Sequence, residues 1–281
     1  VRSPCEPKGD RIGFRCAEAS NTGICMITFQ AAMAAMDDPA IADLNTAALD
    51  HDDVVNLIIQ RSEIIRDQER YNKYIRAWIK GNRKAILDLI DQMGTDLLIR
   101  RAAAFIFLEY RQLRSVFDAK PPRDIADIGC GYGMFDLFLA RDYQCQLNLI
   151  DLETNEHRHF GFEEEGAAYS SLASAKKLLT DNGVPSDTIN TMNPETSDVL
   201  MLRNLDYAFS FISCGYHYPW HTYRDFFLNA VRKDGRIIID IRAKTLGTSV
   251  LELSEIGYLR ALEKAANSTA DRVIIAKTDG I

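Results

Sequence analysis

Cysteine pairs, long apolar runs and an excess of positive charge are all missing from this 281-residue chain. None of its six cysteines forms a C-x-x-C pair, so the usual signature of a structural zinc site is absent, and we expect reduced, buried thiols and no bound metal. No apolar run reaches the length of a membrane span, and no positively charged segment followed by an apolar core marks a signal peptide. We therefore expect a cytoplasmic protein with no membrane partner.

Negative charge outweighs positive charge, with 40 acidic against 33 basic residues and a net charge of −7. This balance argues against binding of nucleic acid through bulk charge. The expected partner is therefore a small molecule, and the residues that would recognise it are sought in local motifs.

Two common phosphate-binding motifs are missing as well. No run of the chain matches the phosphate loop G-x-x-x-x-G-K-[ST], and the place of the third glycine in the dinucleotide motif G-x-G-x-x-G is taken by Met134. The chain has instead Asp-Ile-Gly-Cys-Gly-Tyr-Gly at 127–133. This glycine-rich turn lies between a short apolar segment typical of a strand and an apolar segment typical of a helix start. A strand, a glycine turn and a helix together form a cradle for a nucleotide-like ligand.

The spacing D-x-G-x-G-x-G resembles motif I of the class I S-adenosylmethionine-dependent methyltransferases. The resemblance implies that Asp127 holds the amino-acid end of S-adenosylmethionine and that the glycines face its methionine and ribose. It implicates Asp127, Gly129, Gly131 and Gly133 in cofactor binding, with Cys130 between them in the turn. The alternative is an ordinary glycine-rich turn between a strand and a helix.

A second acid supports an adenosine-type ligand. The segment 146–150 reads as a strand, and Asp151 follows it directly. The two oxygens of a carboxylate suit the neighbouring hydroxyls of a ribose. Because NAD uses the same acid, Asp151 does not choose between the ligands, and the glycine spacing carries that choice. Leu152, next to Asp151, is placed in the same binding site.

The chain divides into three expected parts. Residues 1–50 are expected to be poorly ordered or variable, with Met26 as the natural start; residues 51–120 form a helical cap that begins at Asp52 or Asp53; and residues 121–281 form the methyltransferase domain. The helical part is either a lid over the substrate or a plain packing appendage. The family resemblance implies an α/β fold, a Rossmann-like sheet of seven strands with helices on both faces, preceded by this helical segment. Within the sheet, a turn is expected at 233–235, before a buried fifth strand at 236–241.

An aromatic segment that contains two histidines follows the expected fourth strand, 205–213. The carboxyl ends of neighbouring strands meet at a ligand site, so this segment is expected to face the methyl group. His217 is the expected base and His221 the runner-up, and either Tyr216 or Tyr218 is expected to orient the acceptor. Tyr218, Trp220 and Tyr223 are expected to bind substrate, because aromatic faces stack on sugars. The alternative is a structural aromatic loop.

The pattern G-Y-H-Y-P-x-x-x-Y, which begins at Gly215, looks like that of uncharacterised sugar O-methyltransferases. The resemblance therefore implies O-methylation of a sugar or other small hydroxylated acceptor. Methylation of a small amine and a non-catalytic, cofactor-binding subunit are the alternatives.

Three local assignments remain open. Asn193, after the expected third strand, is either a contact to the adenine amino edge or a turn residue. His157 and His159 are a metal pair or, by the more common outcome, part of a solvated loop. The segment 258–264 is helical by propensity, but the family topology makes it a sixth strand paired antiparallel with 272–277, and we follow the topology.

Overall fold

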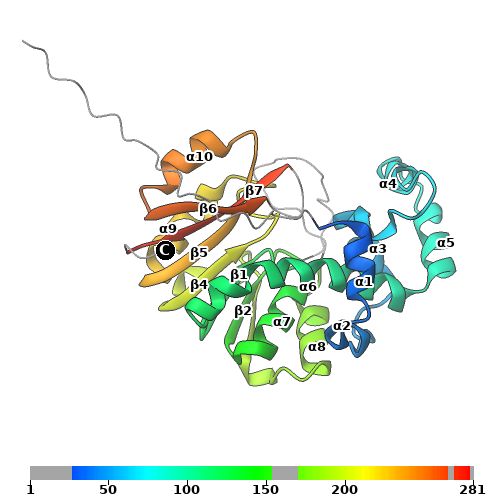
Figure 1. Cartoon of the computed structure of the whole chain (residues 1–281), viewed down its shortest axis with the longest axis horizontal. Helices are drawn as coiled ribbons and strands as arrows, with labels where there is room; N and C mark the ends of the chain where they lie inside the picture. The colour runs from blue at the N-terminus through cyan, green and yellow to red at the C-terminus, as the bar shows by residue number, and fades with distance from the viewer. Residues whose placement is uncertain (1–26, 154–169, 265–268, 279–281) are drawn as a thin grey trace, which may run out of the picture.

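The computed structural model describes residues 27–153, 170–264 and 269–278. Seven strands form one sheet in the order β3-β2-β1-β4-β5-β7-β6 (Figure 1). β1, β2, β3, β4 and β5 run parallel, whereas β7 pairs antiparallel with both β5 and β6. The strands are β1 (Asp124–Ile128), β2 (Gln146–Ile150), β3 (Ile189–Met192), β4 (Leu205–Ser210), β5 (Val231–Arg242), β6 (Tyr258–Lys264) and β7 (Ala270–Ala276). The expected seven-stranded α/β fold is confirmed.

The chain order reverses direction beside β1, which has β2 on one side and β4 on the other. Ala126 of β1 pairs with Asn148 of β2 and with Ala208 of β4. In an open α/β sheet, a ligand binds beyond the carboxyl ends of the strands at such a switch point. The topology therefore brings the segments that follow β1, β2 and β4 to one place.

Helices cover both faces of the sheet, and the N-terminal ones gather beyond one side of it (Figure 1). The α-helices are α1 (Phe29–Ala35), α2 (Pro39–Ala42), α3 (His51–Gln60), α4 (Asn72–Ile79), α5 (Lys84–Met93), α6 (Thr95–Ala119), α7 (Met134–Tyr143), α8 (Leu172–Asp181), α9 (Arg224–Asn229) and α10 (Leu246–Leu253). The short 3-10 helices are η1 (Ser62–Ile65), η2 (Ser186–Thr188), η3 (Val199–Met201) and η4 (Trp220–Tyr223).

Successive side chains of a strand point to opposite faces, and β5 shows this alternation. Ile238 packs into the core formed with α3, α6, α7 and α8, whereas Ile237 and Ile239 pack into the core formed with α9 and α10. On the α6 face, the ring of Phe117 lies 5.4 Å from Tyr207 and 5.6 Å from Phe209, both edge to face. The long helix α6 is thus fixed directly onto β4.

The N-terminal region is more ordered than the sequence predicts. The expectation of little order over residues 1–50 is wrong for 27–50, because Ala32 of α1 and Ile41 of α2 are fully buried in the same core as α6. Asp50, and not Asp52 or Asp53, caps α3, and Asp53 completes the capping box. The proposed start at Met26 lies outside the described residues.

Two strand boundaries differ from the prediction. β4 ends at Ser210 and not at 213, because Ile212 takes a φ of +48° and its N–H donates to Asp240 Oδ2 at 3.1 Å. The turn expected at 233–235 is instead a bulge within β5, since Leu205 pairs with Val231 and Tyr207 with Arg236. Strand β6 is confirmed over 258–264, so topology overrides helix propensity there.

Across the three described stretches, no helix combines the length and apolar character that a membrane span requires.

Candidate functional site

A cavity of about 660 Å³ lies beyond the carboxyl ends of β1, β2, β4 and β5. The glycine turn after β1 and the acid after β2 line one part of it. The loop after β4 and the end of β5 line another part, and residues of α3, η1 and α6 close the remaining side. The N-terminal helices therefore contribute to the cavity directly and do not pack only against the outside of the sheet.

The glycine turn has the backbone conformation that its sequence requires. Gly129 and Gly131 have φ values of +76° and +58°, a region that other residues rarely occupy. A Cβ atom on Gly129 would lie 2.0 Å from Ser213 Oγ and 2.4 Å from Ser213 Cβ, so the loop after β4 approaches the turn too closely for any side chain. At Gly131 the nearest atom would be 3.9 Å away, which leaves room on the cavity side.

Asp151 lies at the edge of the cavity and is held by main-chain donors. Its Oδ2 accepts from the N–H of Gly131 at 2.9 Å, and its Oδ1 accepts from the N–H of Glu153 at 3.1 Å. The side chain of Ser170 also hydrogen-bonds the Asp151 carboxyl group. Burial raises the pKa of Asp151, while the bond from Gly131 opposes that shift. The carboxylate is thus held in a fixed orientation at the cavity.

Asp127 lies beneath the glycine turn, lines the cavity and is buried. Burial raises its pKa to about 7. Asp136, in the first turn of α7, is fully buried beside it, and the two carboxyl groups lie within hydrogen-bonding reach. Two acids meet at this end of the cavity, so it disfavours anions.

The loop after β4 is tied to the sheet by short polar contacts. Ser210 Oγ donates to the carbonyl of Ile128 at 3.0 Å and accepts from the N–H of Cys214 at 2.9 Å. Gly215 has a φ of +89°, and a Cβ there would lie 2.9 Å from the carbonyl of Asp240. These constraints hold His217 in the lining of the cavity.

Tyr216 has a packing role that the sequence does not indicate. Its hydroxyl lies 2.7 Å from Thr269 Oγ1, and the guanidinium of Arg242 lies 4.4 Å from the centre of its ring. Arg242 also donates from Nε to the carbonyl of Tyr216 at 2.8 Å. Tyr216, Arg242 and the ring of His217, 5.0 Å from that of Tyr216, form one wall.

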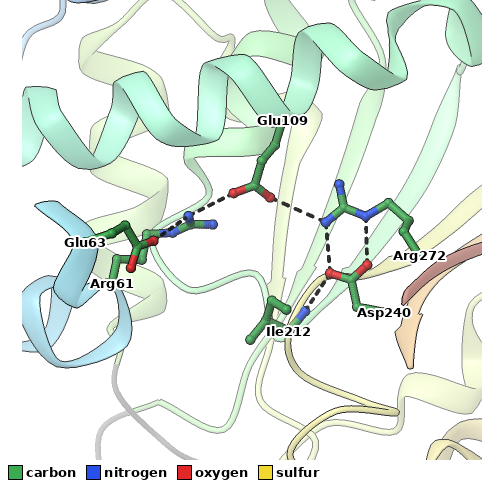
Figure 2. A network of polar contacts seen from close by, with 6 residues as sticks. All are labelled: Arg61, Glu63, Glu109, Ile212, Asp240 and Arg272. Atoms are coloured by element: carbon green, nitrogen blue, oxygen red, sulfur yellow. Dashed lines mark hydrogen bonds and ion pairs between the residues drawn. The ribbon is translucent and has the colours of Figure 1, made fainter. Parts of the chain in front are cut away.

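A chain of charged side chains, buried at Glu109, Asp240 and Arg272, runs from the N-terminal helices to the sheet (Figure 2). Arg61 Nη1 contacts Glu109 Oε1 at 2.8 Å and Glu63 Oε1 at 3.4 Å. Arg272 Nη2 lies 3.4 Å from Glu109 Oε2, and its Nε and Nη2 bind the two oxygens of Asp240 at 2.7 and 2.8 Å. Glu109 thus joins α6 to the C-cap residue of α3 and to β7.

The charges of this network stabilise one another. Burial alone would raise the pKa of Glu109, but the charges of Arg61 and Arg272 outweigh burial and lower it. Because Asp240 also accepts from the N–H of Ile212, the network reaches the loop that carries His217. The network therefore links the side of the cavity made by helices to the side made by strands.

Glu109→Gln is expected to lower the free energy of unfolding by about 3 kcal/mol, since it removes the carboxylate that is shared by the buried guanidinium of Arg272 and the half-buried guanidinium of Arg61. Urea unfolding measures this change. Asp96→Asn is the control, because Asp96 lies on the same helix in an exposed pair with Arg100 and its loss is expected to cost about 0.5 kcal/mol. Equal, small losses in the two variants would contradict this view of the network.

The structure brings most of the predicted site residues together. The cavity lining includes Asp127, Gly129, Cys130, Gly131, Asp151, Leu152, Tyr216, His217, Tyr218 and Tyr223.

Four predicted site residues lie outside the cavity lining, and the first two belong to η4. Trp220 turns into the core beside α9 and donates from Nε1 to Glu252 Oε2 at 2.9 Å. His221 points to solvent. The 3-10 turn after Pro219 separates them from His217, so neither lines the cavity.

The other two are structural. Asn193 accepts from the N–H of Glu195 at 3.0 Å and donates to the carbonyl of Leu152 at 3.3 Å, so it is the turn residue of the open alternative. Gly133 has a φ of +66°, and a Cβ there would lie 2.9 Å from Leu179 Cδ1. The absence of a side chain at Gly133 therefore lets the start of α7 pack against α8.

The sequence did not reveal the contribution of the N-terminal helices to the cavity. Gln60, Arg61, Glu63, Arg66, Tyr71, Phe105 and Glu109 line it from that side. Charged residues within an apolar helical pattern, such as Glu109 in α6, were the available signal. Among the residues that the structure describes, no group of three metal-binding side chains is found, and His157 and His159 lie outside those residues.

No protein-family model matches the sequence, and no curated protein matches it. Among solved structures, the chain is similar to the S-adenosylmethionine-dependent methyltransferase SibL, with 14% identity over 65% of this chain and 58% of SibL and a TM-score of 0.44. The O-methyltransferase TomG from Streptomyces achromogenes, in complex with SAM, is 15% identical over 60% of this chain and 80% of TomG, with a TM-score of 0.43. Magnesium protoporphyrin IX methyltransferase from Synechocystis PCC 6803, with bound SAM, is 15% identical over 63% of this chain and 81% of that protein, with a TM-score of 0.44.

The chain spans less than two thirds of the length of SibL.

Proposed function

We propose that this chain is an S-adenosylmethionine-dependent methyltransferase that methylates a hydroxyl group of a small polar acceptor, with a sugar as the leading candidate. One observation carries the proposal. Asp127, the open glycine turn at Gly131 and Asp151 line one part of a cavity whose other part contains His217. A cofactor compartment and an acceptor compartment thus share one volume.

The residues present fit the cofactor. The Asp151 carboxylate can accept hydrogen bonds from the hydroxyls of a ribose. Leu152 beside it offers an apolar contact for the adenine ring. Gly131 leaves space for close approach to the main chain, with Cys130 beside it in the lining. Asp127 lines the cavity, and a carboxylate there would accept a hydrogen bond from the ammonium group of a methionine moiety.

The same features argue against a dinucleotide. A pyrophosphate needs a glycine turn and a helix N-terminus free of negative charge. Here Asp127 and Asp136 lie beneath the turn, and the buried side chain of Met134 lines the cavity at the first position of α7. A cationic group is the better match for such a site.

The acceptor compartment is polar and aromatic. It is lined by Tyr71 and Arg66 from the N-terminal helical part, and by His217, Tyr218 and Arg242 from the strand side. When bound, S-adenosylmethionine supplies an electrophilic methyl group on a positively charged sulfur. His217 is the base in this proposal, because an imidazole can accept the proton of a hydroxyl near neutral pH. Tyr218 and Tyr223 offer rings on which a sugar can stack.

A screen with methyl-labelled S-adenosylmethionine tests the proposal. The full chain is incubated with nucleotide sugars, free glycans and small amines, and labelled product is separated and identified. We expect label on an oxygen of a sugar. Label on a nitrogen would favour the amine alternative, and binding of the cofactor without any product would favour a non-catalytic subunit.

A further inference from the structure

The carboxyl pair of Asp127 and Asp136 has a geometry that the proposed cofactor site alone does not explain. Asp127 is 3% exposed and lines the cavity, whereas Asp136 is 0% exposed and lies behind it, away from any ligand. Oδ1 of Asp127 and both carboxyl oxygens of Asp136 have no hydrogen-bond partner apart from this pair and the main chain of Asp136. A buried carboxylate with no donor is costly, so one of the two must carry a proton.

The groups around the pair decide which acid keeps it. Asp151 and Asp240 disfavour the charge on Asp127, and Arg272 favours it. Asp136 lies close to Asp127, to the buried thiol of Cys145 and to the half-buried Cys130, and no cation among the described residues contributes to its pKa. Burial, then the charge of Asp127, raises the pKa of Asp136 well above its usual range. The α6 carboxylate Glu109 is already neutralised by its two arginines.

We propose that Asp136 remains protonated at neutral pH and donates a hydrogen bond to Asp127, so that it positions the one carboxylate that meets the ammonium group of the cofactor. Asp136 is then a neutral donor and a positioning residue. This role rests on the proposed cofactor. The role extends the proposed function, because it assigns a task to a buried acid that touches no ligand. An asparagine amide can donate the same bond, so the side chain at 136 is replaceable by a neutral donor, whereas the one at 127 is not.

Calorimetric titration of the full chain with S-adenosylhomocysteine at pH 7.5 tests the positioning role. Asp136→Asn is expected to bind within about twofold of the unmodified chain, because the donor is kept. Asp136→Ala is expected to bind roughly tenfold more weakly, and Asp127→Asn at least as weakly, because a charge-assisted bond is lost. If Asp136→Asn binds as weakly as Asp127→Asn while its fold is intact, Asp136 carries charge and the proposal is overturned.

Thermal unfolding without any ligand tests the proton itself. A carboxyl group with a raised pKa in the folded chain stabilises the fold at acid pH, and this stability is lost as the pH rises towards the folded value. Asparagine has no such dependence. Asp136→Asn is therefore expected to raise Tm at pH 8 by ~3 °C or more, and the gain should shrink towards pH 4.5.

Asp225→Asn is the matched control. Asp225 lies in the first turn of α9, as Asp136 does in α7, but its side chain is 74% exposed. We expect no gain in Tm at pH 8 for this variant. No gain for Asp136→Asn would overturn the assigned proton, whether or not the cofactor binds. No heat with S-adenosylhomocysteine, together with a gain for Asp136→Asn, would overturn the proposed cofactor and the positioning role but leave the proton assignment supported.

Discussion

Asp151→Ala is expected to weaken binding of S-adenosylmethionine about 100-fold. The carboxylate is held by the N–H groups of Gly131 and Glu153, and in the proposed complex it receives two hydrogen bonds from a ribose. Each bond to a charged acceptor contributes roughly 1.5 kcal/mol or more, so loss of both corresponds to about two orders of magnitude in Kd. Calorimetry with S-adenosylhomocysteine measures the change.

Two further variants make this result specific. Asp151→Asn keeps the shape of the side chain and separates loss of charge from loss of packing. Asp124→Asn removes an acid from the opposite, amino end of β1, outside the cavity lining, and is expected to bind normally. If Asp151→Ala binds as tightly as the unmodified chain, the ligand does not contact β2 and the proposed orientation is wrong.

His217→Ala is expected to lower turnover about 100-fold or more while changing the affinity for cofactor less than threefold, as befits a general base on the acceptor side. Its main chain is fixed by the bond from its N–H to the carbonyl of Ser213 at 2.8 Å, so the loop should survive the substitution. Steady-state rates with the acceptor identified by the labelled screen, beside calorimetry with S-adenosylhomocysteine, give the two values.

His221→Ala is the control for His217, because it removes the same side chain from an exposed position of the same segment. Its turnover is expected to match that of the unmodified chain. Unchanged turnover in His217→Ala would remove that residue from the mechanism and would turn attention to Glu63, which also lines the cavity.

The sequence predicted those parts of the fold that local patterns encode. β2, for example, was expected with its observed bounds. Non-local effects account for the errors. The end of β4 at Ser210 depends on Asp240, which lies 30 residues later in the chain. The bulge that replaces the turn at 233–235 depends on pairing with β4.

The same distinction holds for the site. The glycine turn and Asp151 are read from one continuous stretch, and the structure places both at the cavity. The network of Arg61, Glu109 and Arg272 was not predicted, because these residues meet only when α6 packs on the sheet. Proximity in sequence misled for Trp220 and His221, since a single 3-10 turn carries them away from His217.

Calorimetric titration of the full chain with S-adenosylmethionine tests the central claim most directly, with thermal unfolding in parallel. A ligand that binds only the folded chain stabilises it by about 2.7 kcal/mol at a concentration 100 times Kd, so the proposal predicts a saturable heat and a rise in Tm. S-adenosylhomocysteine should behave alike, and NAD should give neither signal. Absence of heat and of a Tm shift with S-adenosylmethionine, or binding of NAD in its place, would contradict the proposed methyltransferase.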